Sequence, residues 1–387
     1  MTSMNTKFSE TFKDKKVLVT GHTGFKGAWL ALWLSEMGAD VVGYALEPST
    51  TPSLFECMNL NNRITHIIGD IRDEQHLNSV FEQYKPEFVF HLAAQALVRY
   101  SYRHPKETYE TNVMGTINLF EAARKTDSVR VFVNVTSDKC YENKEWDYGY
   151  REVDRFGGFD PYSNSKGVSE LVTSAYRNSF FNPKDFGMLH NMSLATARAG
   201  NVIGGGDWAE DRLVPDCIRS LTVNKEIIIR NPDATRPWQF VLEPLSGYLT
   251  LAARMYQDGI KYAEGWNFGP SDDAVLRVHE VVSDVVNHWG HGSIKVESDG
   301  KLHEAGLLKL DISKARRKLD WNPVYSAKEA VKATVDWYKA FYSGQNAAAE
   351  KLYDFSIMQL NEYIDTAKMR DISWGIADEN FYKPVSK

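Results

Sequence analysis

The chain has 387 residues and a mass of 44.0 kDa, enough for one large α/β domain with an attached lobe or for two to three smaller domains. Hydrophobic residues make up 43% and charged residues 25%, which argues against the disordered, fibrous and low-complexity classes. The net charge is −6 with both signs interspersed, so the sequence offers no basic surface for nucleic acid or acidic lipid.

The sequence shows no sign of a membrane or secretory segment. No apolar run approaches the roughly 18 residues that span a bilayer, and the N-terminus is polar. Cys57, Cys140 and Cys217 are odd in number and far apart, which argues against a disulfide framework or a cysteine zinc site. We therefore expect a cytoplasmic protein with reduced cysteines and with no metal, nucleic-acid or membrane partner.

Short apolar runs alternate with segments of helical spacing through the first 200 residues. The expected strands are 16–20, 41–44, 65–68, 88–92, 129–135 and 192–197. The expected helices are 28–37, 74–84, 108–124 and 163–180. Strands that alternate with helices indicate βαβ units, so we predict an α/β fold with a Rossmann-type doubly wound parallel sheet.

Beyond the glycine-rich loop 200–208 the spacing is less regular and predicts a smaller C-terminal substrate lobe. The elements expected there are helices 216–222, 245–256 and 276–287, and strands 227–230 and 266–268. We assign residues 12–200 to the Rossmann domain, to whose sheet later strands can return. Residues 201–345 form the interleaved lobe, and 346–387 form a tail with a helix, an irregular end and no assigned role.

A glycine-rich turn joins the first expected strand to the first helix. Gly21, Gly24 and Gly27 permit a tight turn that brings backbone N–H groups close to a pyrophosphate at the helix N-terminus. An ordinary βα turn is the alternative for this motif alone. The spacing resembles that of the extended short-chain dehydrogenase/reductase family, and this resemblance implies NAD as the cofactor.

A tyrosine and a lysine stand four residues apart at the start of the helix expected at 163–180. Tyr162 and Lys166 fall on one helix face, about one turn apart. The ammonium favours a phenolate, so Tyr162 can remove a hydroxyl proton while a hydride leaves the same carbon, provided that its pKa falls well below about 10. A solvated pair is the alternative for this motif alone.

The segment after the strand expected at 129–135 narrows the reaction. In the nucleotide-sugar 4,6-dehydratases of this family the corresponding pattern is Thr-Asp-Glu, which supplies a hydroxyl for the C4 oxygen, an acid and a base. Ser137, Asp138 and Lys139 stand at these positions. An acid at Asp138 favours elimination of water over epimerisation or reduction, while a strand-end turn with solvated charges is the alternative.

Longer runs resemble the CDP-glucose members of these dehydratases from about residue 12 to about residue 340. They are HLAAQALVRYSYRHPKETYETNVMGT (91–116), VTSDKCYENKEW (135–146), GYRE (149–152), DPYSNSKG (160–167) and RAGNVIGGGDW (198–208). Lysine after the acid is typical of those members. The resemblance implies NAD-dependent conversion of CDP-D-glucose to CDP-4-keto-6-deoxy-D-glucose, a hydro-lyase step of deoxysugar biosynthesis for lipopolysaccharide O-antigen.

The same resemblance implies three groups of site residues. The catalytic residues are Ser137, Asp138, Lys139, Tyr162 and Lys166. Besides Tyr162 and Lys166, cofactor contacts are implied at Gly21, His22, Gly24, Phe25, Lys26, Gly27, Asp70, Ile71, Leu92, Ala93, Ala94 and Asn112. Substrate contacts are implied at Gln95, Arg198, Asn201, Trp208, Leu213, Val214, Arg236 and His303.

Several residues keep an alternative at this stage. An ammonium cannot abstract the C5 proton, so Lys139 acts either as a base with a lowered pKa or as a cation that stabilises the enolate. His22, Lys26 and Arg236 can bind phosphates or lie on the surface. Ala45 stands where relatives carry a ribose-binding acid, which Glu47 can replace, and the absence of a following arginine favours NAD over NADP.

Two rival functions remain open. A nucleotide-sugar 4-epimerase, or a dehydratase for another nucleotide sugar, needs the same fold. A non-catalytic NAD sensor or scaffold would also retain the fold, although intact Tyr162 and Lys166 speak against it. We expect a homodimer that pairs through the helices at 108–124 and 163–180.

Overall fold

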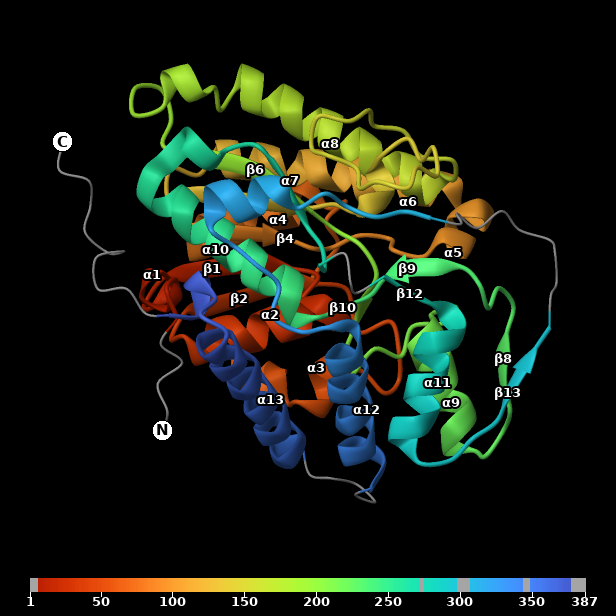
Figure 1. Ribbon diagram of the computed structural model, residues 1–387. Coiled ribbons are helices and arrows are strands. Elements are labelled where there is room, and N and C mark those ends of the chain that lie inside the picture. Colours follow the sequence, from red (N-terminus) through yellow and green to blue (C-terminus); the bar gives the residue numbers. More distant parts are fainter. Residues whose placement is uncertain (1–5, 272–274, 298–306, 344–348, 377–387) are drawn as a thin grey trace.

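A parallel sheet forms the centre of the computed structural model, which describes residues 6–271, 275–297, 307–343 and 349–376 (Figure 1). Its strand order is β11-β6-β5-β4-β1-β2-β3, and every neighbouring pair is parallel. The seven strands are β1 Lys16–Thr20, β2 Asp40–Ala45, β3 Thr65–Ile68, β4 Phe88–His91, β5 Val131–Val135, β6 Ser193–Ala199 and β11 Gly265–Phe268. The order reverses beside β1, which confirms the doubly wound Rossmann-type sheet.

The helices that follow the strands match the expected positions closely. They are α2 Phe25–Glu36, α4 Glu74–Tyr84, α6 Pro105–Tyr109, α7 Gly115–Arg124, α8 Pro161–Ser179 and α10 Leu242–Asp258. Between α6 and α7 the chain forms a π-helical segment, Glu110–Met114, so the helix expected at 108–124 begins earlier and is not uniformly α-helical. Three short helices complete this part: α1 Ser9–Phe12, α3 Leu54–Cys57 and α5 Val98–Arg103.

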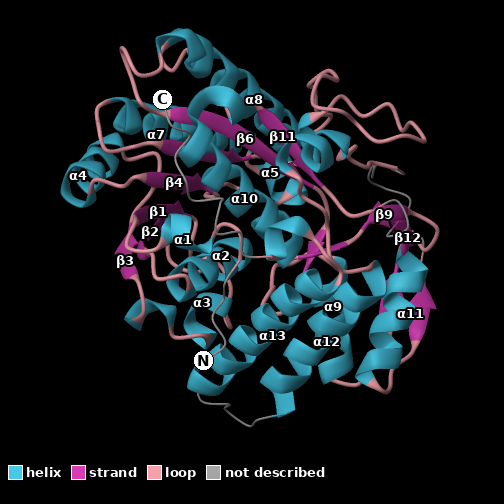
Figure 2. Cartoon of the chain, turned by 60° about the vertical axis from the view of Figure 1, so that its left-hand side comes forward, coloured by secondary structure: helices cyan, strands magenta, loops and turns pink. Residues whose placement is uncertain are grey.

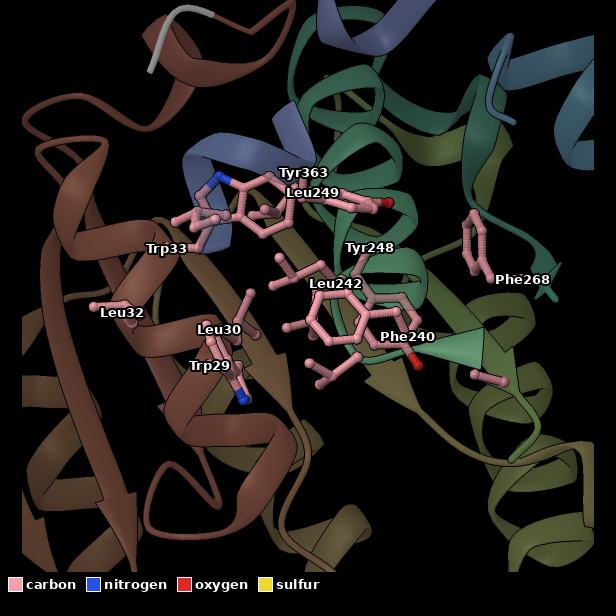
Figure 3. Close-up of a cluster of buried hydrophobic side chains, with 14 of the residues drawn as sticks. Trp29, Leu30, Leu32, Trp33, Phe240, Leu242, Tyr248, Leu249, Phe268 and Tyr363 are labelled. Atoms are coloured by element: carbon pink, nitrogen blue, oxygen red, sulfur yellow. The ribbon is translucent and has the colours of Figure 1, made fainter. Parts of the chain in front are cut away.

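Alternation along the strands divides the interior into two hydrophobic clusters. In β1, Val17 and Val19 belong to the larger cluster, whereas Leu18 belongs to the smaller one with residues of α4 and α7. Helices α2 and α10 cover the larger cluster. Figure 3 shows Trp29 and Trp33 of α2 facing side chains of α10. Because both faces are covered, β4, β5 and β6 are buried along their whole length and mostly apolar, as is typical of a parallel sheet.

A smaller lobe lies beside the carboxyl ends of the strands (Figures 1 and 2). Its helices are α9 Leu213–Thr222 and α11 Val278–Trp289. Its strands form three small sheets from β7 Val202–Ile203 with β10 Gln239–Phe240, β9 Thr235–Pro237 with β12 Val275–Arg277, and β8 Ile227–Ile229 with β13 Ile294–Val296. The chain returns from this lobe to the main sheet through β11, so lobe and sheet domain are interleaved.

The segment expected to be a tail packs into the same core as the sheet. Its helix α13 Ala349–Met369 contacts α12 Ala327–Ser343 of the preceding segment, and both helices contribute to the larger hydrophobic cluster. Trp374 stacks on Phe8 with ring centroids 5.9 Å apart, and Tyr363 hydroxyl donates to Glu243 at 2.8 Å. Within the described residues, no helix is both long and apolar enough to cross a bilayer.

Candidate active site

A cavity of about 1880 Å³ opens where the carboxyl ends of the strands face the lobe. Ligand pockets for one small molecule usually measure about 300–1,000 Å³, so this volume has room for two ligands of nucleotide size. Its lining runs from the glycine-rich turn, past the ends of β2, β3 and β4, to Tyr162 and Lys166, and then to α9 and Arg236. The position agrees with the general rule for ligand binding in open α/β sheets.

The glycine-rich turn at one end of the cavity depends on close backbone contacts. Gly21 has φ +78°, and a Cβ there would lie 2.7 Å from the backbone N of Ala93. A Cβ on Gly27 would lie 2.1 Å from the carbonyl oxygen of Gly21. Helix α2 starts at Phe25 within this turn, so the turn exposes backbone N–H groups that fit the pyrophosphate of a dinucleotide.

Residues from β2, β3 and β4 line the next part of the cavity. Ala45 ends β2 and Glu47 follows it, so a carboxylate two residues beyond the expected position does line the wall. Asp70 after β3 accepts hydrogen bonds from Arg72 Nε at 2.9 Å and NH2 at 2.6 Å. Burial opposes ionisation of Asp70, but the bonds from Arg72 outweigh it and hold the pKa of Asp70 below its usual value.

The predicted catalytic turn lies directly after β5. Ser137 caps the short 3₁₀ segment Asp138–Cys140 and donates to Asp138 Oδ1 at 2.9 Å. Asp138 is buried, whereas about a third of the Lys139 side chain is exposed. The ammonium of Lys139 lies 3.7 Å from Asp138 Oδ1. The turn therefore presents a hydroxyl, an acid and a cation to the cavity together.

Tyr162 and Lys166 lie one turn apart on α8 and both line the cavity. Burial raises the pKa of Tyr162 to about 12, with Asp138 adding to the rise and Ser137 and Arg212 opposing it. The condition for Tyr162 to act as a base, a pKa well below 10, is therefore not met by the protein alone, because burial dominates. Burial lowers the pKa of Lys166 to about 8, and its ammonium donates to Val135 carbonyl oxygen at 3.3 Å.

Two cations near this pair were not assigned to catalysis from the sequence. Lys26 of the glycine-rich turn lies 3.4 Å from the hydroxyl of Tyr248 in α10, and burial lowers its pKa to about 8. Arg212 precedes α9 and pairs with Asp207 at 2.6 Å. Neither Arg212 nor Tyr248 belongs to a recognisable motif, so no signal in the sequence identified them.

Three of the expected ligand contacts have side chains outside the cavity lining. The ring of His22 lies against Gly43, with Nε2 2.6 Å from His66 Nδ1. Asn112 bonds the backbone N and O of Gln95 and thereby holds the loop after β4. Arg198 is 3% exposed and paired with buried Glu170 at 2.8 Å, so its guanidinium is already engaged within the protein.

The other expected contacts line the cavity. From the sheet domain these are Gly21, Gly24, Phe25, Lys26, Gly27, Asp70, Ile71, Leu92, Ala93, Ala94 and Gln95. From the lobe they are Asn201, Trp208, Leu213, Val214 and Arg236. His303 lies outside the described residues. Within the described ranges, no three His, Cys, Asp or Glu side chains group as a metal site would require.

The sheet order, the glycine-rich turn and the Tyr162–Lys166 pair define the extended short-chain dehydrogenase/reductase class. The family model described as GDP-mannose 4,6 dehydratase matches residues 18–334. CDP-glucose 4,6-dehydratase of Salmonella typhimurium is 54% identical over 87% of this chain and 93% of that protein. The chain belongs to this family of nucleotide-sugar 4,6-dehydratases.

More distant relatives share the fold. dTDP-glucose 4,6-dehydratase of Salmonella typhimurium is 25% identical over 84% of this chain and 93% of that protein. Among solved structures, UDP-glucose 4-epimerase of Thermotoga maritima with UDP-glucose has a TM-score of 0.71, at 24% identity over 84% of this chain and 99% of that one. dTDP-glucose 4,6-dehydratase of Bacillus anthracis with NAD has a TM-score of 0.68, at 19% identity over 84% of this chain and 96% of that one.

Proposed function

We propose that the protein is an NAD-dependent CDP-glucose 4,6-dehydratase that forms CDP-4-keto-6-deoxy-D-glucose. The observation that carries this proposal is the placement of Ser137, Asp138 and Lys139 in one cavity with Tyr162 and Lys166. The 54% identity to the Salmonella enzyme supports CDP-glucose as the substrate. An epimerase would need Tyr162 and Lys166 but would have no use for a buried acid beside them.

The residues of the chain divide the reaction between them. Removal of a hydride from C4 and its return to C6 is the chemistry that bound NAD supplies. Tyr162 accepts the proton of the C4 hydroxyl, with Ser137 bonding the same oxygen. The resulting C4 ketone acidifies the C5 proton, which passes to water in the cavity, and a proton returns from water to C5 when the hydride reaches C6. Asp138 then protonates the C6 hydroxyl so that it departs as water.

The raised pKa of Tyr162 bears on the first step. A phenol with a pKa of about 12 is protonated at neutral pH. Accepting a proton from the C4 hydroxyl therefore requires additional positive charge near the phenol. The cations nearby are Lys166, Lys26 and Arg212, and the positively charged nicotinamide of bound NAD would add to them.

The geometry of Lys139 supports the role of an electrostatic stabiliser. Its ammonium lies 3.7 Å from Asp138 Oδ1, so a positive charge stands beside the acid. A cation at this place stabilises the negative charge that develops on the C4 oxygen when the C5 proton leaves. It also orients the carboxyl of Asp138 toward the cavity.

The residues present fit NAD. The close contacts at Gly21 and Gly27 leave backbone N–H groups exposed to a pyrophosphate. Asp70 and Ile71 line the wall where the adenine would lie, and Glu47 lines the wall near the adenosine ribose. A carboxylate at that wall suits the ribose 2′-hydroxyl and opposes a 2′-phosphate, which supports NAD over NADP.

A homodimer and a cytoplasmic location belong to the same proposal. Apolar side chains project from the π-helical segment, from α8 and from the residue that caps α8, with Met114 50%, Leu171 57% and Phe180 46% exposed. Pairing of these helices with those of a second copy would bury the exposed side chains. Light scattering at working concentration tests this, and a monomeric mass would contradict it.

The experiment that tests the reaction uses purified protein with NAD. CDP-glucose, dTDP-glucose and GDP-mannose are incubated separately, and product mass is followed by spectrometry. Loss of one water from CDP-glucose alone is the expected result. Loss of water from another nucleotide sugar would overturn the base preference, and interconversion without mass change would favour the epimerase.

A further inference from the structure

The buried carboxylate of Glu170 makes the densest set of polar contacts near the catalytic residues. It stands one helical turn after Lys166 on α8 and is 3% exposed. Oε1 accepts from Thr136 Oγ1 and from Arg198 Nε at 2.8 Å, and Oε2 accepts from Thr196 Oγ1 at 2.7 Å and from Arg198 NH2 at 2.8 Å. Both oxygens are satisfied, in the two-pronged arrangement typical of arginine and carboxylate.

Arg198 extends this network to the far side of the catalytic turn. Its NH1 donates to Tyr141 hydroxyl at 2.5 Å, and that hydroxyl donates to Asn267 Oδ1 of β11 at 2.8 Å. The guanidinium also lies over the ring of Phe156, 4.9 Å from its centroid. Arg198 thus connects Tyr141, which follows the 3₁₀ segment, to the strands β6 and β11.

The contacts bracket the catalytic turn in the sequence. Thr136, bonded to Glu170, immediately precedes Ser137. Tyr141, bonded to Arg198, immediately follows the segment Asp138–Cys140. The turn is therefore anchored at both ends to one ion pair, and one member of that pair, Glu170, lies on the helix that carries Tyr162 and Lys166.

We propose that the Glu170–Arg198 pair is a positioning element that holds the turn of Ser137, Asp138 and Lys139 in register with Tyr162 and Lys166. Neither member lines the cavity, so both act through the residues that they hold. This inference rests on the proposed dehydratase function. Arg198, expected to contact substrate, is engaged in this network and does not line the cavity.

Besides positioning the turn, Glu170 affects the pKa of Lys166 through its negative charge. Glu170 raises the pKa of Lys166, while burial lowers it, and Cys140 of the catalytic turn contributes to the rise. From other elements, Lys26 of α2 and His91 of β4 also face the ammonium. Loss of the Glu170 charge lowers the pKa of Lys166, so the alkaline limb of the activity profile moves to lower pH.

The test compares three variants with the wild-type protein. Glu170→Gln removes the charge and leaves Arg198 unpaired. Tyr141→Phe removes only the hydroxyl that connects Arg198 to the turn. Glu170→Gln combined with Arg198→Met removes both charges, so no unpaired buried arginine remains to destabilise the fold. Circular dichroism and thermal melting report whether each variant folds.

We expect kcat for CDP-glucose to fall at least about 10-fold in the folded variants, with KM within a few-fold of the wild-type value, because the reacting groups lose register while substrate contacts remain. In Glu170→Gln the alkaline limb moves down by about one pH unit. In Tyr141→Phe, enzyme-bound reduced cofactor accumulates during turnover, seen by its absorbance, because the elimination step slows more than oxidation at C4.

Glu243→Gln is the matched control, since Glu243 is also a buried helical carboxylate with backbone and tyrosine partners, none of which belongs to the turn. It is expected to change stability without moving the pH limb. Wild-type kcat in the folded double variant, or an unmoved limb in Glu170→Gln, would overturn the positioning role. If the wild-type protein itself forms no ketosugar, the proposed function fails instead.

Discussion

Substitution of Gly27 by alanine tests whether the glycine-rich turn is held by close backbone contact. Gly27 lies in the first turn of α2, where alanine is ordinarily favoured over glycine by about 1 kcal/mol. A Cβ at this position, however, would stand 2.1 Å from the Gly21 carbonyl oxygen and 2.8 Å from the Cα of His22. The neighbours are backbone atoms, so they cannot rotate away as a side chain would.

Opening the turn enough to admit the methyl group requires a shift of roughly one ångström, and overpacking of this kind costs about 1–3 kcal/mol. We therefore expect Gly27→Ala to be destabilised despite its better helix propensity. Equilibrium unfolding in urea, followed by tryptophan fluorescence, measures the change. The shifted turn should also bind NAD at least about 10-fold more weakly, measured by titration of the purified protein.

Gly24→Ala provides the comparison within the same turn. A Cβ there would meet only the Gly21 carbonyl oxygen at 3.4 Å, an ordinary contact. Gly24 caps α2, and alanine is a poorer cap than glycine, so we expect a loss below about 1 kcal/mol. A Gly27→Ala protein that is as stable as the wild type, or more stable, would refute the reasoning from close contact.

Three further predictions concern Lys139, the buried histidines and the exposed Leu171. Lys139→Met should lose dehydration, whereas Lys139→Arg should keep exchange of the C5 proton with solvent, measured by mass spectrometry in deuterated water; loss of exchange would assign the base role to Lys139. Burial lowers the pKa of both His22 and His91 to about 3, so stability is present above pH 6.5 and is lost as pH falls. Each histidine should cost about 2 kcal/mol between pH 7 and pH 5, so the two together cost about 4 kcal/mol, and urea unfolding of His91→Gln should show about half of that combined loss. Leu171→Asp should give a monomer by light scattering with unchanged circular dichroism, and an unchanged dimer mass would place the interface elsewhere.

The sheet was predictable because its strands are buried on both faces and punctuated by glycine and polar turns. The runs at 16–20 and 65–68 and the helix at 74–84 have the predicted bounds. The helix expected at 108–124 was less predictable, because the π-helical segment Glu110–Met114 within it has no distinct sequence signature. Asn112 lies in that segment, and its amide holds the loop at Gln95 rather than a ligand.

Side-chain direction, in contrast to element position, depends on neighbours that the sequence does not reveal. In β6, Ala195, Ala197 and Ala199 belong to the larger hydrophobic cluster, so Thr196 and Arg198 face the other side of the sheet. Only the placement of α8 over that side shows that both meet Glu170. The sequence motif at 198–208 implied that Arg198 contacts substrate, whereas the structure pairs Arg198 with Glu170.

The distribution of charge across the site follows from which groups are already paired. Asp70, Asp207 and Glu170 each have an arginine partner, so these carboxylates add little net negative charge to the cavity. Asp138 is the buried acid whose nearest cation, Lys139, stands 3.7 Å away and partly in solvent. Asp138 is held only by the Ser137 hydroxyl and by this partly solvated cation, so it can exchange its proton during turnover. A carboxylate in a two-pronged arginine contact cannot. The pairing pattern therefore separates the carboxylate suited to donate a proton to the departing hydroxyl from those that hold the site in shape.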